Sequence, residues 1–233
     1  MNGTDGFLPS TLMLLKQVAI DTNAEYADIL GIERSTAITC VKPSGTVSQL
    51  VDAASGIHTR HSKYYIRSVR GANSDPLTQF MKDNGIPNEP DVTKPNQTTV
   101  FYFPIKSPEG ALVRDSLTAV GHLELWKTYQ DYWCEHKPSI TVSVKEHEWP
   151  SVGSWVWNNF DSVSGISFLP FSDHTYRQAP YEECTEEKYN EMLKKMPIDI
   201  DFDSFREISD NTSGSQTFAC SGSDSCEIVD ISA

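Results

Sequence analysis

The stretch Ala37-Ile-Thr-Cys-Val-Lys-Pro-Ser-Gly-Thr-Val-Ser-Gln-Leu50 decides the fold that we expect for the rest of the chain. Its first five residues, Ala37 to Val41, are apolar or β-branched and predict a strand. A Pro-Ser-Gly-Thr turn follows, and Val47 opens a predicted helix of about ten residues that Gly56 ends. A strand, a tight loop and a helix in succession direct free backbone N–H groups, and the positive end of the helix dipole, at one point. The sequence therefore predicts an anion site at this loop.

The side chains of the loop suit a phosphate group. Gly45 lets the backbone approach a ligand closely, and Lys42 supplies a point charge. Three hydroxyl groups are available as further donors. The predicted phosphate site consists of Lys42, Pro43, Ser44, Gly45, Thr46, Val47 and Ser48. The pattern GxxxxGK[ST] is absent, which argues against an ordinary nucleoside triphosphatase, and the alternative from spacing alone is a capped helix after a buried strand.

Strands and helices alternate along the chain. Helical spacing of apolar residues predicts a first helix that Ser10 caps and Gly31 ends. Further strands are expected at 64–69, 98–105, 139–144 and 166–170, and further helices at 76–84, 115–136, 150–160 and 185–196. Because helices of crossover length separate the strands, the pattern predicts an α/β fold with parallel strands, as an open sheet or a barrel.

The composition narrows the function. The chain has 233 residues and a formal net charge of −13, which argues against binding to nucleic acid or to a membrane surface. No apolar run is long enough to span a membrane, and residues 1–15 lack the features of a signal peptide, so we expect a cytoplasmic protein. The five cysteines form an odd and scattered set, which predicts reduced thiols.

The end of the sequence differs from the rest. Residues 208–233 are rich in Asp, Ser and Gly and predict a mobile acidic tail. Cys220 and Cys226 lie in this tail with Ser-Gly-Ser-Asp-Ser between them, a spacing that lets the two sulfurs meet without strain. An exposed disulfide of this kind is suited to thiol exchange. Zinc is the alternative, but no third or fourth ligand lies nearby in the sequence, so no metal site is expected.

A basic cluster follows the loop in this acidic chain. It comprises His58, Arg60, His61, Lys63, Arg67 and Arg70. We predict a basic rim of His58, Arg60 and Arg67 that draws a negative substrate toward the loop. The alternative is a solvated surface on which His58 is a packed turn residue.

Several blocks of the sequence occur in a characteristic order. They are Val41-Lys-Pro-Ser-Gly-Thr-Val-Ser48, Ser55-Gly-Ile-His58, Tyr64-Tyr-Ile-Arg67, Ser74-Asp-Pro76, Glu89-Pro-Asp-Val92, Cys134-Glu-His-Lys-Pro-Ser139, Trp155-Val-Trp157, Gly165-Ile-Ser-Phe-Leu-Pro170 and Ala179-Pro-Tyr181, followed by the tail cysteine pair. From about Ala19 onward, this series resembles the C-terminal part of the monomeric, adenosylcobalamin-dependent (class II) ribonucleoside-triphosphate reductases.

The resemblance implies a division of the chain. Residues 1–18 do not look like the family, residues 19–205 would supply the C-terminal portion of a ten-stranded α/β barrel, and residues 206–233 would form the mobile tail. The loop 42–48 would hold the substrate's phosphates. The thiols of Cys220 and Cys226 would re-reduce an active-site disulfide and be recharged by thioredoxin. One departure is that five residues separate these cysteines, where family members usually have four.

One motif of the family is missing. Asn-x-Cys-x-Glu, whose cysteine carries the thiyl radical formed after cobalt–carbon homolysis, does not occur in the sequence. The resemblance therefore implies a fragment or split subunit of an enzyme that reduces ribonucleoside triphosphates to 2′-deoxyribonucleoside triphosphates. Its partner would be the N-terminal part of the reductase, and the isolated chain would be inactive. The alternatives are a stand-alone phosphate-binding protein with a redox-sensing tail, and an inactive truncation product. An exposed apolar surface would favour an incomplete barrel over the stand-alone protein.

Overall fold

The computed structural model describes residues 8–45, 47–171 and 176–206. These residues form two compact units, which the following paragraphs describe one at a time. The first unit contains the described residues up to Arg60 and those of 108–171, and the second contains 61–107 and 176–206. The sequence does not predict this division, and the boundaries expected at 18/19 and 205/206 stay predictions.

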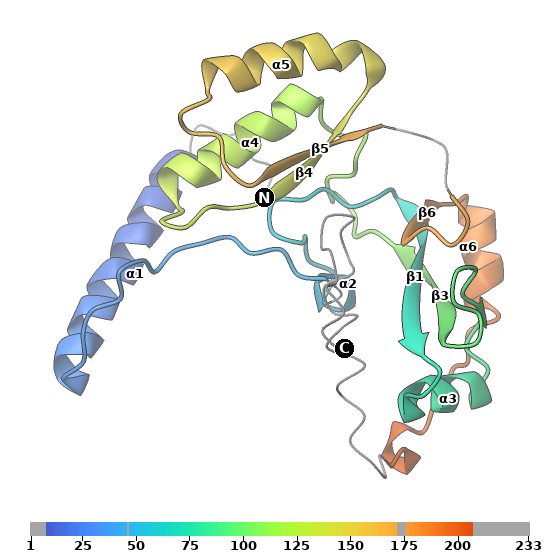
Figure 1. Ribbon diagram of the computed structural model, residues 1–233. Coiled ribbons are helices and arrows are strands. Elements are labelled where there is room, and N and C mark those ends of the chain that lie inside the picture. The colour runs from blue at the N-terminus through green and yellow to red at the C-terminus, as the bar shows by residue number, and fades with distance from the viewer. Residues whose placement is uncertain (1–7, 46, 172–175, 207–233) are drawn as a thin grey trace, which may run out of the picture. The chain divides into compact units, whose positions relative to one another are not determined.

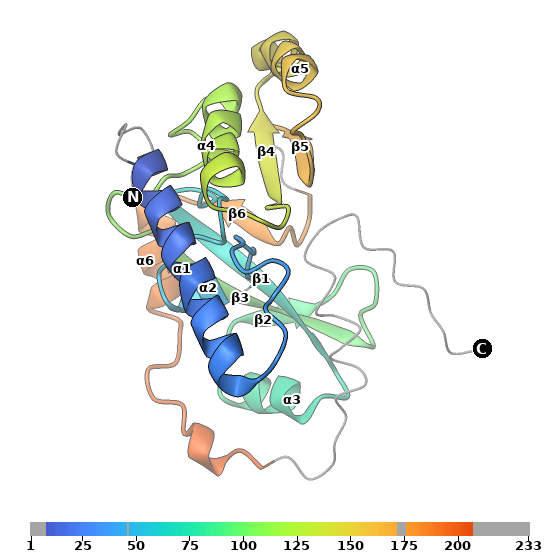
Figure 2. The ribbon, with the colours of Figure 1, turned by 90° about the vertical axis from the view of Figure 1, so that its left-hand side faces the viewer.

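The first unit is built on two parallel strands. Its elements are α1 (Leu8–Leu30), α2 (Val47–Leu50), α4 (Ala119–Tyr132), β4 (Ile140–Val144), the 3₁₀ helix Glu146–Glu148, α5 (Trp149–Asn158) and β5 (Ile166–Pro170). The strands β4 and β5 pair in parallel, with Ile140 opposite Ile166. The predicted parallel pairing with a helical crossover is therefore confirmed for β4, α5 and β5. Figure 1 shows α4 and α5 over these two strands, and Figure 2 shows α4 lying beside β4.

The core of the first unit lies on one side of β4. Ile140, Val142 and Val144 alternate along this strand and are buried against α4 and α5. The rings of Trp126 and Trp155 meet edge to face, with centroids 6.4 Å apart. The buried apolar side chains of α4, among them Leu123 and Trp126, thus pack in the core.

The second unit is an antiparallel sheet with the strand order β2-β3-β1-β6 (Figure 2). Its elements are β1 (Tyr64–Ala72), α3 (Pro76–Asp83), β2 (Asn88–Pro90), β3 (Thr98–Lys106), β6 (Tyr181–Glu183), α6 (Glu186–Leu193) and the 3₁₀ helix Phe202–Ser204. Gly71 lets Thr78 of α3 pack closely on β1, because a Cβ at this position would overlap the Thr78 hydroxyl.

The prediction of parallel strands is wrong for this second sheet. The strands β1 and β3 pair antiparallel over nine residues each, with Tyr64 opposite Lys106. The sequence between them contains a helix and so looks like a crossover. In the structure, however, β2 pairs antiparallel with β3, which reverses the chain and brings β3 back beside β1.

Local signals located most helices but not all their ends. Asp75 caps α3 by accepting a hydrogen bond from Leu77 N at 2.9 Å, and Gly31 follows α1 with a φ of 66°. Ser10 is not the cap of α1, because the helix begins at Leu8 and Pro9 occupies its first turn, where a missing N–H costs nothing. The helix expected from residue 115 begins at Ala119, after Thr118 as its cap. The three-residue strands β2 and β6 were not predicted.

An apolar surface is exposed on the first unit. Of the 23 residues of α1, only Leu12 and Ala27 are buried. Seven large apolar side chains of this helix are 50–67% exposed, namely Met13, Leu14, Leu15, Val18, Tyr26, Ile29 and Leu30. On β5, Leu169 is 51% exposed, although parallel sheets are normally covered on both faces. These surfaces are typical of parts that a larger protein would cover. None of the helices in the described residues is both long and apolar enough to cross a membrane.

The contrast between core and exposed surface can be measured. Leu123 of α4 is 0% exposed, so Leu123→Ala should lower the free energy of unfolding by about 2–5 kcal/mol. Leu14 is 66% exposed, so Leu14→Ala should change it by less than about 0.5 kcal/mol in the isolated chain. Urea unfolding followed by tryptophan fluorescence measures both. Equal losses for the two variants would contradict this assignment of core and surface.

Candidate functional site

The predicted loop lies at the surface of the first unit. Lys42, Pro43 and Gly45 are exposed, whereas Ser44 is half-buried. Val47 is exposed, and Ser48 is buried with no hydrogen-bond partner for its hydroxyl among the described residues. Thr46 lies outside the described residues. The solvent-facing donors of the loop are therefore its first residues and not Ser48.

Two predictions about the flanks of the loop are wrong. Residues 37–41 form no strand in the structure, because the backbone of Ile38 and Thr39 bonds to the segment just after α4 and not to a neighbouring strand. Ile38 N and Thr39 N donate to the Glu135 carboxylate at 2.9 and 3.0 Å, and Thr39 O accepts from Glu135 N at 2.8 Å. The helix α2 has four residues instead of about ten, so it contributes little macrodipole. Anion binding here must rely on Lys42 and on individual N–H and O–H donors.

The segment Ser55-Gly-Ile-His58, which we call the loop clasp, holds the loop in place. The Ser55 hydroxyl accepts a hydrogen bond from Ser44 N at 2.9 Å and donates one to Ser44 O at 2.7 Å. Gly56 has a φ of 60°, and a Cβ there would stand 3.3 Å from the Lys42 carbonyl oxygen. Ile57 lies in the core. The clasp therefore needs a hydroxyl, a glycine and an apolar side chain in this order.

His58 connects the clasp to β4. Its Nδ1 lies 2.8 Å from Ser55 O, and its Nε2 accepts a hydrogen bond from Thr141 N at 3.1 Å. The imidazole is therefore neutral, with its proton on Nδ1. Burial lowers the pKa of His58, and it also lowers the pKa of His122, whose Nε2 lies 2.7 Å from Ile57 O. These contacts support the alternative that His58 is a packed turn residue.

The other residues of the predicted basic rim are also engaged within the chain. Arg60 is 5% exposed and lies behind the loop, where it bonds to the Gln49 side chain at 2.8 Å. Arg67 belongs to the second unit, stacks on Tyr181 at 4.3 Å and donates to Pro180 O at 3.2 Å. Because Arg60 is buried, it does not form part of an exposed basic rim. A substrate role for Arg67 stays a prediction.

The predicted redox pair lies outside the described residues, because Cys220 and Cys226 follow residue 206. Cys40, Cys134 and Cys184 are free thiols, and burial raises the pKa of Cys134 and Cys184. The described residues contain no group of three or more His, Cys, Asp or Glu side chains that could hold a metal ion.

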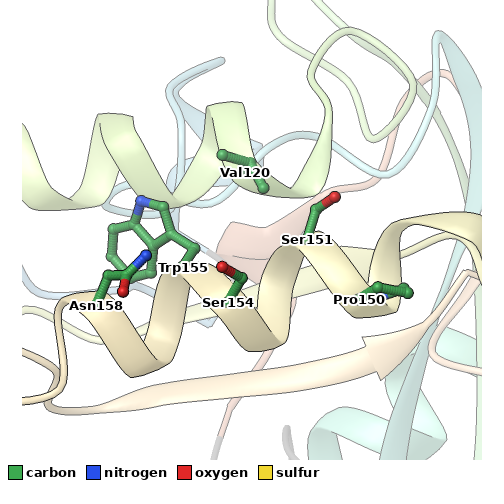
Figure 3. Close-up of a pocket in the computed structure, with 6 residues that line it drawn as sticks. All are labelled: Val120, Pro150, Ser151, Ser154, Trp155 and Asn158. Carbon is green, nitrogen blue, oxygen red and sulfur yellow. The ribbon is translucent and has the colours of Figure 1, made fainter.

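A depression between α4 and α5 is a separate feature of the first unit. Figure 3 shows Val120 of α4 opposite α5, with the indole of Trp155 between the two helices. The indole N–H of Trp155 donates to the Glu124 carboxylate at 2.6 Å. Ser151 and Ser154 also line the depression, which shares no residue with the loop or its clasp. We assign no function to it.

Comparison with known proteins agrees with this fold. No family model matches the chain. A probable adenosylcobalamin-dependent ribonucleoside-triphosphate reductase of Dictyostelium discoideum is 34% identical over 185 residues, which cover 77% of this chain and 24% of that protein. The reductase of Euglena gracilis is 30% identical over 200 residues, 85% of this chain and 27% of its own length. The crystal structure of a B12-dependent (class II) ribonucleotide reductase matches with a TM-score of 0.72 and 26% identity, over 84% of this chain and 28% of that one.

The fold and these matches show that the chain belongs to the ribonucleotide reductase family. More particularly, its similarity is to the adenosylcobalamin-dependent ribonucleoside-triphosphate reductases, so the resemblance predicted from the sequence is confirmed. The chain spans about a quarter of the length of the curated relatives that it matches. The α/β architecture is that of a partial barrel.

The buried histidines predict a dependence of stability on pH. Both pKa values are lowered in the folded chain, so below the ordinary value of 6.5 the unfolded chain binds more protons than the folded chain. The free energy of unfolding should therefore fall as the pH drops from 7 toward 5. His58→Gln removes one of the two groups and should flatten this dependence, measured by urea unfolding at several pH values. The matched control is His136→Gln at an exposed site, and identical profiles for wild type and His58→Gln would contradict the role of His58.

A substitution at Gly45 tests whether phosphate approaches the backbone of the loop at this residue. Its φ is not in the left-handed region, and a Cβ there would meet no atom of the described chain within 4 Å, so the described structure does not require a glycine. Gly45→Val should leave the melting temperature unchanged but weaken binding of inorganic tripolyphosphate by about tenfold or more, because a side chain displaces the phosphate from backbone donors. Isothermal titration calorimetry measures the affinity, with Gly153→Ala on α5 as the control. An affinity within twofold of wild type would place the phosphate site elsewhere.

Proposed function

We propose that the chain is a fragment or split subunit of a cytoplasmic ribonucleotide reductase that reduces ribonucleoside triphosphates to 2′-deoxyribonucleoside triphosphates. The observation that carries this proposal is the asymmetry of the sequence matches. They cover 75–85% of this chain but only 24–27% of relatives that are named as adenosylcobalamin-dependent ribonucleoside-triphosphate reductases. The chain then corresponds to one part of such an enzyme, and the complete enzyme requires a complementary part.

The loop 42–48 is the substrate contact that we assign to this chain. The chain carries a net charge of −13, so a triphosphate must be held by local donors and not by the overall field. Lys42 offers such a charge at the exposed end of the loop, and Gly45 leaves room for the phosphate oxygens. Hydrogen bonds to charged phosphate are about twice as strong as those between neutral groups, so a few well-placed donors suffice.

The second role that we assign to this chain is to supply electrons for the next turnover. Cys220 and Cys226 would attack the disulfide that each turnover leaves in the active site, accept the oxidised state as their own disulfide, and be reduced by thioredoxin. This assignment rests on the sequence, in which two cysteines separated by five residues lie in an acidic segment.

The complementary part must supply what this chain lacks. The radical motif Asn-x-Cys-x-Glu does not occur in the sequence, and the described residues hold no cluster suited to a metal ion. We therefore assign the radical cysteine to the N-terminal part of the reductase, and adenosylcobalamin, which supplies the radical in this class of enzyme, to the complete enzyme. The exposed apolar side of α1 is the surface on this chain that such a partner would cover. A stand-alone phosphate-binding protein would have no need of that surface.

Reconstitution tests the proposal. The chain should form a stable complex with a polypeptide that carries Asn-x-Cys-x-Glu, and only the complex should reduce nucleoside triphosphates when adenosylcobalamin and thioredoxin are added. Leu14→Asp on the exposed side of α1 should prevent the complex without unfolding the chain, whereas Glu25→Gln on an exposed polar position should not. A chain that stays monomeric beside its complement would favour the stand-alone protein, and an inactive complex would favour the truncation product.

The same complex separates the tail from the chemistry. Cys220→Ser or Cys226→Ser should preserve the first turnover of a prereduced complex and abolish sustained turnover with thioredoxin, because the tail acts only between turnovers. A small dithiol that enters the active site should restore repeated turnover. Rapid-quench measurement of product per enzyme distinguishes the two phases. Sustained turnover of either variant with thioredoxin would show that this pair is not the shuttle.

A further inference from the structure

Arg60 is held behind the loop from a fixed base. Its backbone N donates to Leu112 O at 2.8 Å, and its carbonyl oxygen accepts from Arg114 N at 3.0 Å. Its guanidinium is buried and reaches the one-turn helix α2, where it bonds to the Gln49 side chain at 2.8 Å and to Ser48 O at 3.3 Å. The side chain thus braces the end of the loop from the protein interior.

The turn that follows α2 is completed by an unusual residue. Ser48 O also accepts a hydrogen bond from Ala53 N at 2.9 Å, which closes the helix around Asp52. Asp52 has a φ of 53°, in the left-handed region where glycine or asparagine is the usual choice. Its carboxylate lies 3.9 Å from the Arg60 guanidinium, and the two side chains are 71% and 4% exposed. Asp52 therefore has a left-handed backbone conformation, and its exposed carboxylate lies near the buried guanidinium of Arg60.

We propose that Arg60 is a positioning residue that fixes the loop for polyphosphate, and that Asp52 is a counter-charge that lowers the affinity of the loop for anions. This inference rests on the proposed function of the loop 42–48. Arg60 is too deeply buried to contact a ligand at Lys42 and Gly45, so it acts through the backbone of Ser48 and through its charge. A buried charge acts over a longer distance than an exposed one, because less water screens it. The exposed carboxylate of Asp52 opposes that charge at the surface.

Three substitutions separate geometry from charge. Arg60→Met keeps the length of the side chain but removes both its hydrogen bonds and its charge. Arg60→Lys keeps the charge but not the planar group that bonds to two acceptors. Asp52→Asn removes the carboxylate and retains a residue that tolerates the left-handed conformation. The last variant should therefore fold at least as well as the wild type.

The experiment uses the full chain with inorganic tripolyphosphate, followed by calorimetry at low and high salt. Arg60→Met should weaken binding by about tenfold or more, which is the loss expected for a buried hydrogen-bonded charge. Arg60→Lys should lie between Arg60→Met and the wild type and should keep the salt dependence of the wild type. Asp52→Asn should tighten binding by about two- to fivefold, the range of an exposed ion pair, and this gain should shrink at high salt. A purely structural role of Arg60 predicts that Arg60→Lys loses as much affinity as Arg60→Met, because the retained charge would then not contribute.

Hydrogen exchange provides the second measurement. In Arg60→Met, the amides of residues 47–53 should exchange faster, while those of β4 should keep their protection. If Arg60→Met does not fold, Arg60→Lys and Asp52→Asn carry the test. If the wild type binds tripolyphosphate and these variants bind it with the same affinity, the inference is wrong, but the assignment of the phosphate loop is not contradicted. A wild-type chain that binds no tripolyphosphate would overturn the phosphate loop and the inference together.

Discussion

The parallel pairing of β4 with β5 is the constraint on which the first unit depends. Parallel strands are joined by a crossover connection, which usually places a helix over one face of the sheet. Parallel sheets are normally buried on both faces. Here α4 and α5 cover one side and bury Ile140, Val142 and Val144. Side chains such as Leu169 leave the sheet with apolar surface exposed to solvent. The strand β4 also anchors the functional loop, since its Thr141 N–H bonds to His58 of the clasp. The same pair of strands therefore carries exposed apolar surface on β5 and positions the clasp of the loop through β4.

Much of this structure could be predicted from local sequence, because helix ends depend on residues close in the chain. Asp75 and Thr185 cap α3 and α6 as their positions indicate, and the alternating pattern identified β4. Strands depend on partners that local sequence does not specify. The segment 37–41 has the composition of a strand, but Glu135 takes up its N–H groups, and the matched relatives are about four times longer than the part that aligns here. The direction of β3 was missed for the same reason, since β2 has only three residues.

In the candidate site, the orientation of the side chains could not be predicted from local sequence either. The sequence identifies the loop and the charged residues after it, but it does not tell which charges face solvent. Arg60 and His58 were predicted at a rim because they follow the loop closely, yet both point into the first unit. One signal could have corrected this. Gly56 and Ile57 lie between Ser55 and His58, and a glycine beside a large apolar residue favours a turn that packs against the core.

The bonds described for the loop lie within the first unit, whereas the apolar surface of α1 is left exposed. Ser55, His58 and Arg60 hold the loop through partners that the chain itself provides. By contrast, the exposed side of α1 is covered by no part of the described chain. The two needs are therefore separable. Under the proposed function, the phosphate loop forms within this chain before a partner associates, and the partner supplies the radical chemistry. An order of events follows in which the chain folds and forms its phosphate loop first. Under the proposed function, burial of α1 against the partner would then place the ribose of a substrate, held through its phosphates by the loop, beside the radical cysteine of the partner.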